Sequence, residues 1–170
     1  DMTFRQPNNN SAYAIAAGLE QFLEYIENLH FSEDDLAYLD SLNLFDDSFF
    51  DLLRDLRFTG DIDAVPEGTV VFPNEPMVRV KAPLIEAQLI ETALLNIINH
   101  QTLIATKASR VVMAAQGDNV LEFGLRRAQG PDAGIYGARA TIIGGCSGTS
   151  NVMTGQMFGI PVSGTHSHSW

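Results

Sequence analysis

The sequence predicts an α/β protein in which a mixed unit of helices and strands is followed by alternating strands and helices. Apolar residues recur at helical spacing over much of residues 11–57, and short runs with period-two alternation follow between residues 62 and 81. From residue 120 onward, candidate strands alternate with candidate helices. Such alternation is typical of parallel strands, so we expect the last part to begin an α/β barrel or an open α/β sheet.

The first third of the chain predicts a short strand over residues 1–5 and helices over 11–30, 33–42 and 47–57. The helix expected over 11–30 has one apolar face, formed by Ile15, Leu19, Phe22, Leu23, Ile26 and Leu29.

The second of these helices has a clear start signal. Ser32 is a good N-cap with Asp35 three residues later, and Phe31 is placed to pack on Leu36.

Short strands follow, over 62–64, 69–72 and 77–81, separated by proline-containing turns at 66–68 and 73–76. In the last strand Val78 and Val80 alternate with basic residues, which predicts one exposed face.

The rest of the chain predicts a helical stretch over 84–115, in two pieces that meet near residues 99–100, and then the alternating section. Its elements are a strand over 120–123, a helix over 132–142 ended by two glycines, a short helix over 150–157 and a strand over 160–162. We therefore expect an N-terminal α/β domain with its helical linker over 1–115 and the first strand–helix units of a barrel over 116–170.

Composition excludes several classes of protein. The 170 residues are 45% hydrophobic and 18% charged, which is typical of a globular chain. No apolar run approaches the roughly 18 residues of a membrane-spanning helix, so we expect no membrane partner. Cys146 is the single cysteine, which favours a reducing compartment, and we expect a cytoplasmic protein.

Charge is unevenly placed along the chain. The net charge is −11, which argues against a nucleic-acid partner. Residues 1–67 carry −12 and residues 68–170 carry +1, so anionic ligands are expected to bind the second part. The alternative interpretation is that the acidic part is only a solvated, solubilising face.

The strongest candidate for chemistry is the segment from Glu122 to Asp132, with the sequence Glu-Phe-Gly-Leu-Arg-Arg-Ala-Gln-Gly-Pro-Asp. It follows a predicted strand, where ligands bind in parallel α/β proteins. Arg126 and Arg127 present planar donors that suit a carboxylate or a phosphate. Alternatively, one arginine pairs with Glu122 or Asp132 and the other is solvated.

Three other features carry weaker signals. The loop over 144–151 is rich in glycine and hydroxyl groups and precedes a helix, so it can bind an anion, or Thr149 or Ser150 can be a simple N-cap. The histidines at 166 and 168 have poor spacing for one metal, and either can be structural or can act in proton or group transfer. We expect Cys146 to be a small buried residue and His30 and His100 to be surface or capping residues.

Three of these stretches together resemble the nicotinate phosphoribosyltransferase family: residues 122–132, Gly148-Thr-Ser-Asn-Val152 and Gly164-Thr-His-Ser-His-Ser-Trp170. Weaker resemblance lies at 4–5, 17–20, 66–68 and 88–95. The resemblance implies a type II phosphoribosyltransferase fold, with an N-terminal α/β domain and an irregular α/β barrel that is incomplete in this chain. It implies an ATP-dependent enzyme of ligase or glycosyltransferase type. Such an enzyme joins nicotinate to phosphoribosyl pyrophosphate (PRPP) in NAD biosynthesis, with Mg²⁺ on the phosphorylated substrates and an active site near a homodimer interface.

The resemblance also implies roles for particular residues. His168 matches the family's transiently phosphorylated catalytic histidine, while His166 falls where the pattern varies. Arg126 and Thr165 match substrate-contacting positions, and Phe123 lies where the related nicotinamide enzyme stacks an aromatic ring on the pyridine. Ser150 stands where that enzyme carries an aspartate, so we expect nicotinate to be preferred, because serine does not repel the substrate carboxylate.

Three alternatives stay open: a sister phosphoribosyltransferase for nicotinamide, one for quinolinate, or a non-catalytic binding module of the same fold. Both ends look cut, and the family's Thr-Asp-Leu-Tyr pattern near the N-terminus is absent. We therefore expect a fragment of a longer polypeptide, inactive on its own.

Overall fold

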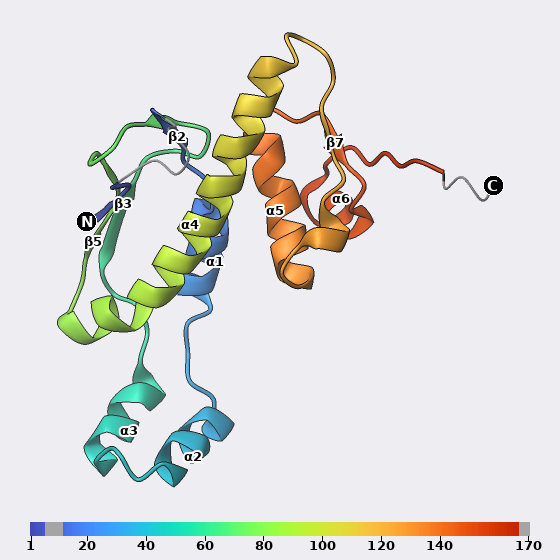
Figure 1. Cartoon of the computed structure of the whole chain (residues 1–170). Helices are drawn as coiled ribbons and strands as arrows, with labels where there is room; N and C mark the ends of the chain where they lie inside the picture. The colour runs from blue at the N-terminus through green and yellow to red at the C-terminus, as the bar shows by residue number, and fades with distance from the viewer. Residues whose placement is uncertain (6–11, 167–170) are drawn as a thin grey trace.

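The structure is a computed structural model that describes residues 1–5 and 12–166 of the chain. The long helix α4 (Leu84–Ala114) runs through the middle of the molecule (Figure 1). The N-terminal strands lie on one side of it, α5, α6 and β7 lie on the other, and α1 overlaps α4 in this view (Figure 1). The pair α2 and α3 projects away from this body (Figure 1).

The N-terminal strands form an antiparallel sheet in the order β1 (Met2–Thr3), β5 (Pro76–Lys81), β3 (Asp61–Ala64). Ile62 pairs with Val80 in this sheet. Met77 and Val78 are buried whereas the basic residues of β5 are exposed, which confirms the exposed face expected for this strand. The sheet packs against α1 and α4 to form the main core, whose buried residues are Ala14, Ala16, Phe22, Leu29, Leu56, Val71, Met77, Val78, Ile90, Leu94 and Ile98.

The helix expected over residues 11–30 is wrong in its first part. Residues 14–15 form a strand, β2 (Ala14–Ile15), which pairs antiparallel with β4 (Val70–Val71). The helix α1 (Leu19–Glu27) begins only at Leu19. Of the predicted apolar face, Ile15, Phe22 and Leu29 are buried and Leu19 and Ile26 are half-buried, whereas Leu23 is exposed. Most of the face is thus buried despite the different backbone, because a buried strand and a buried helix face both call for apolar residues.

Helix α4 holds the residues before α1 in their extended conformation. The amide of Ile15 donates to the hydroxyl of Thr106 at 2.9 Å, and the amide of Ala17 donates to that of Thr102 at 3.2 Å. Gly18 then has φ 101°, a left-handed conformation that glycine adopts without strain. Pairing with distant side chains has therefore overridden the local helical pattern.

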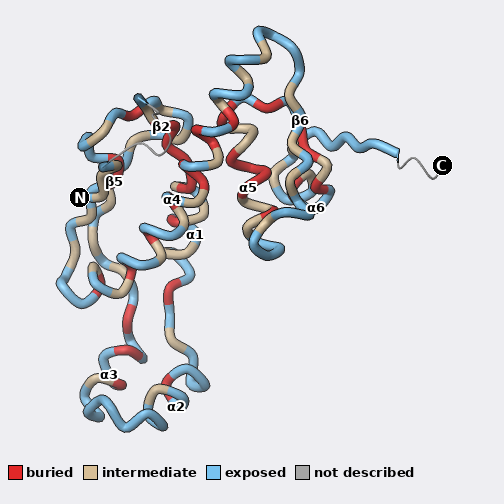
Figure 2. The backbone as a smooth tube through the Cα atoms, in the orientation of Figure 1, coloured by how far each residue is buried: buried red, intermediate tan, exposed pale blue. Residues whose placement is uncertain are grey.

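Helices α2 (Glu33–Ser41) and α3 (Asp47–Asp55) confirm the two helices expected over 33–42 and 47–57. Ser32 and Asp35 form a capping box at the start of α2. A small core of Leu36, Phe50 and Leu53 joins the two helices, and Phe31 packs against it. Most other residues of the pair are exposed, as the backbone colouring shows (Figure 2).

The break expected in α4 near residues 99–100 is wrong, because the helix is continuous over 31 residues. Its interior contains neither proline nor glycine. The buried residues Ile90, Leu94, Ile98 and Ala105 keep one face in register throughout. That face packs against α1, β2 and α5, so α4 supports both halves of the molecule.

The last section alternates strands and helices with parallel pairing, as expected. β6 (Leu121–Glu122) pairs parallel with β7 (Gly148–Thr149), and Thr149 makes a further parallel bridge to Val162. The connecting helices are α5 (Pro131–Ile143) and α6 (Val152–Phe158). The strands are shorter than the predicted spans 120–123 and 160–162.

The boundary expected after residue 115 falls just past the end of α4, and the division into 1–115 and 116–170 stays a prediction. Across the part of the chain that the structure describes, no helix is both long and apolar enough to cross a membrane.

Candidate functional site

The candidate site lies at the carboxyl ends of β6 and β7. The chain leaves β6 into the loop of residues 123–130, which we call the arginine loop, and leaves β7 into residues 150–151, which precede α6. Because the two strands are parallel, both exits lie at the same edge of the sheet. This edge brings together residues of two of the three stretches that carry the sequence motifs, 122–132 and 148–152.

Glu122 joins the two strand ends. One of its carboxylate oxygens accepts from the amide of Gly124, and the other accepts from the hydroxyl of Thr149 at 2.5 Å. Its backbone carbonyl accepts from the amide of Ser150 at 2.9 Å. The alternative in which Glu122 pairs with an arginine is wrong, because none of the ion pairs among the described residues includes Glu122.

The arginine loop contains a short 3-10 helix, η2 (Leu125–Arg127). Phe123, Arg126 and Arg127 are all exposed. Among residues 1–5 and 12–166, no ion pair includes either arginine, so the pairing with Asp132 is also wrong. The guanidinium groups therefore remain available to an anionic ligand.

Asn151, rather than Thr149 or Ser150, caps α6. Its side-chain oxygen accepts from the amide of Thr154 at 3.3 Å. Thr149 is 0% exposed, and its hydroxyl accepts from the amide of Asn151 at 3.0 Å. Ser150 is half-buried, and within the described residues its side chain makes no hydrogen bond.

The predicted site residues near the C-terminus are not brought to this sheet edge by the described part of the chain. Thr165 and His166 are exposed on a segment that leads away from the body (Figure 1). His168 lies outside the described residues. The structure thus brings together Phe123, Arg126 and Ser150 at one sheet edge, and it leaves the positions of Thr165 and His168 relative to that edge as predictions.

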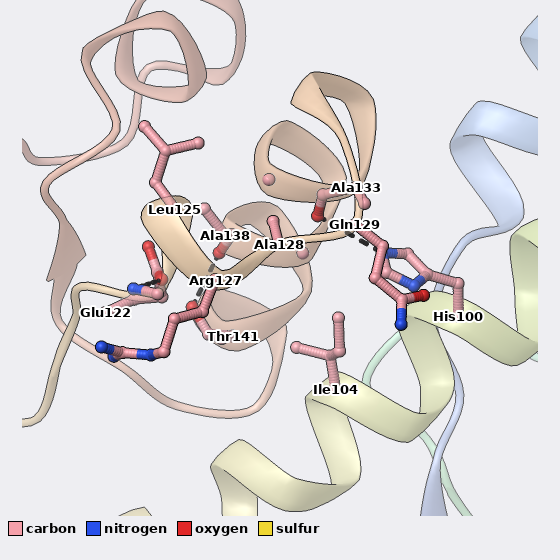
Figure 3. A pocket seen from close by; sticks show the side chains of 13 residues that line it. His100, Ile104, Glu122, Leu125, Arg127, Ala128, Gln129, Ala133, Ala138 and Thr141 are labelled. Atoms are coloured by element: carbon pink, nitrogen blue, oxygen red, sulfur yellow. Dashed lines mark hydrogen bonds between the residues drawn. The ribbon is translucent and has the colours of Figure 1, made fainter.

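A cavity of about 360 Å³ lies between α4, α5 and the arginine loop (Figure 3). His100 of α4 and Gln129 of the loop lie at one end of it, and Arg127 and Glu122 lie at the other (Figure 3). The His100 Nε2 atom is 3.3 Å from the carbonyl oxygen of Ala133. From the sequence we expect His100 to be a surface or capping residue, and we do not predict that it lines a cavity. The available signal was two glycines on α5: Gly137 makes room beside Ile104 and His100 of α4, and Gly134 makes room beside Leu125 and Ala128 of the arginine loop.

The sequence interpretation also missed a buried polar network around Arg139. Arg139 is 8% exposed and hydrogen-bonds to Glu67, Glu20 and Gln101, which come from a turn, α1 and α4. Its guanidinium also lies 5.5 Å from the centre of the Phe158 ring. The one signal was a positive charge in the interior of a helix, 131–143, whose other charged residue is Asp132 in the first turn.

Burial and ion pairing shift the pKa values of Glu67 and Arg139 in opposite directions. Burial by itself would raise the pKa of Glu67, but the hydrogen bonds and charge of Arg139 and the amides of Gly18 and Leu19 lower it overall. Burial by itself would lower the pKa of Arg139, whereas Glu67 and then Glu20 raise it overall. Both groups are therefore held in their charged forms.

Cys146 is 8% exposed, which confirms the expectation of a buried residue. Burial raises the pKa of its thiol, so the thiolate form is disfavoured. Within the described residues, no group of three or more histidine, cysteine or carboxylate side chains is arranged to hold a metal ion.

Comparisons with known proteins identify the same family as the sequence resemblance. Residues 1–99 match the family model described as nicotinate phosphoribosyltransferase (NAPRTase) N-terminal domain. The chain is 48% identical over 170 residues to a nicotinate phosphoribosyltransferase of Mycobacterium tuberculosis, covering 100% of this chain and 37% of that protein. It is 53% identical over 169 residues to the nicotinate phosphoribosyltransferase of Bacillus subtilis, covering 99% of this chain and 34% of that protein.

Solved structures with related names also match the fold of the chain. The crystal structure of human nicotinic acid phosphoribosyltransferase matches with a TM-score of 0.91 and 38% identity, covering 98% of this chain and 34% of that one. A nicotinate-nucleotide pyrophosphorylase from Pyrococcus furiosus matches with a TM-score of 0.76 and 28% identity, covering 98% and 35% of the two chains. The chain spans about a third of the length of the relatives it matches.

Proposed function

The chain belongs to the nicotinate phosphoribosyltransferase family, and from this premise we propose that it forms part of an enzyme of NAD biosynthesis. That enzyme joins nicotinate to PRPP and releases nicotinate mononucleotide and pyrophosphate. The expected fold, related to the type II phosphoribosyltransferases, is confirmed by the match to the human structure, of which this chain covers 34%.

The juxtaposition of Phe123, Arg126 and Ser150 at one sheet edge carries the proposal. Nicotinate is a flat aromatic ring with one carboxylate. An exposed aromatic side chain suits the ring, and an unpaired guanidinium suits the carboxylate. Ser150 adds a small hydroxyl without negative charge. The two motifs were separate in the sequence, and their placement at neighbouring strand ends supports a common substrate.

The chemistry explains why such a site needs cations and shielding from water. Displacement at the sugar C1 carbon breaks the bond to pyrophosphate and forms a bond to the pyridine nitrogen. Holding the two anionic substrates together in line lowers the barrier, and positive groups stabilise the departing pyrophosphate. We assign to Arg126 the binding and orientation of the acidic pyridine.

We further propose, from the resemblance, that ATP hydrolysis is coupled to the reaction through phosphorylation of His168. Thr165 is proposed to contact nicotinate. Mg²⁺ would be held mainly by the phosphates of PRPP and ATP, as is usual for this ion. The proposal also includes a cytoplasmic homodimer with the site near its interface. Light scattering of the purified hybrid enzyme tests the dimer, because it measures the mass of the particle in solution.

The test requires the length that the relatives have and this chain lacks. We would build a hybrid enzyme in which these 170 residues replace the matching segment of the Bacillus subtilis relative. Formation of nicotinate mononucleotide from nicotinate and PRPP is followed with and without ATP, beside a His168→Ala variant. We expect ATP to stimulate the hybrid and the variant to lose that stimulation.

Other outcomes would redirect the proposal. Product from nicotinamide or quinolinate, but not from nicotinate, would assign the chain to a sister enzyme. The absence of product from any pyridine, in a folded hybrid whose histidine takes up no labelled phosphate, would favour a non-catalytic module. We expect the isolated 170 residues to show no turnover, because they span only about a third of the length of the relatives they match.

A further inference from the structure

Glu122 has no role in the proposed chemistry, yet it is the residue that connects the two motif-bearing loops. The strands β6 and β7 share only two residue pairs, Leu121 with Gly148 and Glu122 with Thr149. So short a ladder fixes the relative position of its two ends weakly. Additional contacts must therefore hold the loops that leave these strands.

Those contacts converge on Glu122. Its side chain accepts from the amide of Gly124 at the base of the arginine loop. The same carboxylate accepts from the buried hydroxyl of Thr149, and its backbone carbonyl accepts from the amide of Ser150. One residue thus holds the start of both loops through three hydrogen bonds.

The connection continues beyond Thr149. The Thr149 hydroxyl gives its one proton to Glu122, and its oxygen accepts from the amide of Asn151. Asn151 in turn caps α6 by accepting from the amide of Thr154. A change at Glu122 is therefore passed along a continuous series of hydrogen bonds to the start of α6.

We propose that Glu122 is a positioning residue that sets the separation between the arginine loop, with Phe123 and Arg126, and Ser150. We assign it an indirect role, because each carboxylate oxygen already accepts a hydrogen bond from one of the two loops. It affects nicotinate binding indirectly, by fixing the positions of the side chains that bind the pyridine ring and the carboxylate. This inference rests on the proposed function, and it adds a residue to which the motif comparison gives no role.

The substitutions separate positioning from simple loss of charge. Glu122→Ala removes both side-chain acceptors. Glu122→Gln keeps one acceptor oxygen and the shape of the side chain. Thr149→Val removes the hydroxyl that Glu122 binds, and Thr149→Ser retains it. Because both residues act through the same hydrogen bond, the Glu122→Ala and Thr149→Val effects should be non-additive.

Glu75 provides the matched control. Its carboxylate also accepts a backbone amide, that of Phe72 at 2.9 Å, within an exposed turn of the N-terminal sheet. The turn lies far along the chain from both loops and belongs to a different sheet. Glu75→Ala removes a comparable glutamate–amide bond without touching the strand ends.

The first measurement is steady-state kinetics of the hybrid enzyme described above. We expect Glu122→Ala and Thr149→Val to raise the KM for nicotinate about 10- to 100-fold, with a smaller change in the KM for PRPP. Glu122→Gln should recover part of the loss, Thr149→Ser should recover most of it, and Glu75→Ala should match the parent. A KM for nicotinate within about twofold of the parent in both Glu122→Ala and Thr149→Val would overturn the proposal.

The second measurement is amide hydrogen exchange by mass spectrometry on the same proteins, which needs no turnover. We expect Glu122→Ala to speed exchange in peptides that cover 122–126 and 148–151, while peptides from α4 and the N-terminal sheet keep their rates. Equal acceleration throughout would indicate a general loss of stability and would overturn the positioning role, as would unchanged exchange at 148–151. If the parent hybrid turns over no pyridine, the proposed function fails, and the exchange data still decide whether Glu122 holds the two loops.

Discussion

The Arg139 guanidinium lies 2.6 Å from the Glu67 carboxylate, in a buried contact between α5 and the turn that precedes β4. Glu67 also accepts from the amides of Gly18 and Leu19 at the start of α1. This one contact therefore links the N-terminal sheet region, the first helix and the strand–helix units that carry the candidate site. We expect it to contribute to the stability of the whole chain rather than to a single element.

Replacing Arg139 by alanine should destabilise the protein by about 3 kcal/mol, because it removes a buried guanidinium and leaves the half-buried Glu67 carboxylate without its charged partner. The measurement is urea-induced unfolding followed by circular dichroism. Arg79→Ala is the matched control, since Arg79 makes an exposed ion pair with Asp1 at 2.8 Å, and such pairs contribute less than about 1 kcal/mol. Equal losses in the two variants would contradict the importance assigned to the buried contact.

Stability should fall in acid partly through Glu67. Its pKa in the folded protein is below its ordinary value of 4.5, so the unfolded chain binds a proton more readily. The stabilisation is complete above about pH 4.5 and is lost as the pH falls through the lowered folded pKa. We expect Glu67→Gln to be less stable at neutral pH and to lose less stability between neutral and acidic pH than the parent. An unchanged pH dependence in Glu67→Gln, with exposed Glu75→Gln as control, would contradict this.

Local signals predicted most of the helices and the parallel pairing. Ser32 with Asp35 marked the start of α2, and the alternation after residue 120 indicated parallel strands. The errors arose where distant residues decide the conformation. Thr102 and Thr106 of α4 hold residues 15 and 17 extended, and no pattern within residues 11–18 contains that information.

In the candidate site, too, features set by the local sequence were predictable and contacts between distant residues were not. The motif around Arg126 and the loop before α6 were identifiable as candidates, and the parallel sheet places them at one edge. The bridge through Glu122 and the network around Arg139 were not predictable, because each joins residues that are far apart in the sequence. In the sequence, Glu122 was equally compatible with pairing to an arginine.

Cys146 should react slowly with a thiol reagent such as DTNB in the folded protein. The side chain is buried, burial raises the pKa of the thiol, and the charge of Glu122 acts in the same direction. We expect the rate to rise steeply when urea unfolds the chain. A Cys146→Ser, Ser147→Cys double variant moves the thiol to the neighbouring exposed position and should react fast when folded. A parent rate as fast as that of the double variant would contradict the burial of Cys146.

Ser150→Asp should shift the hybrid enzyme away from nicotinate and toward nicotinamide. An aspartate here would place a second negative charge beside the substrate carboxylate, whereas it would accept a hydrogen bond from an amide group. Contacts of this kind differ by a few kcal/mol, which corresponds to a change of about 10- to 100-fold in relative kcat/KM. The measurement is kcat/KM for both pyridines with PRPP held constant. Ser147→Asp, which adds the same charge at an exposed position before β7, is the control and should leave the ratio unchanged. Nicotinate kinetics that are the same in Ser150→Asp and the parent would remove Ser150 from the substrate site.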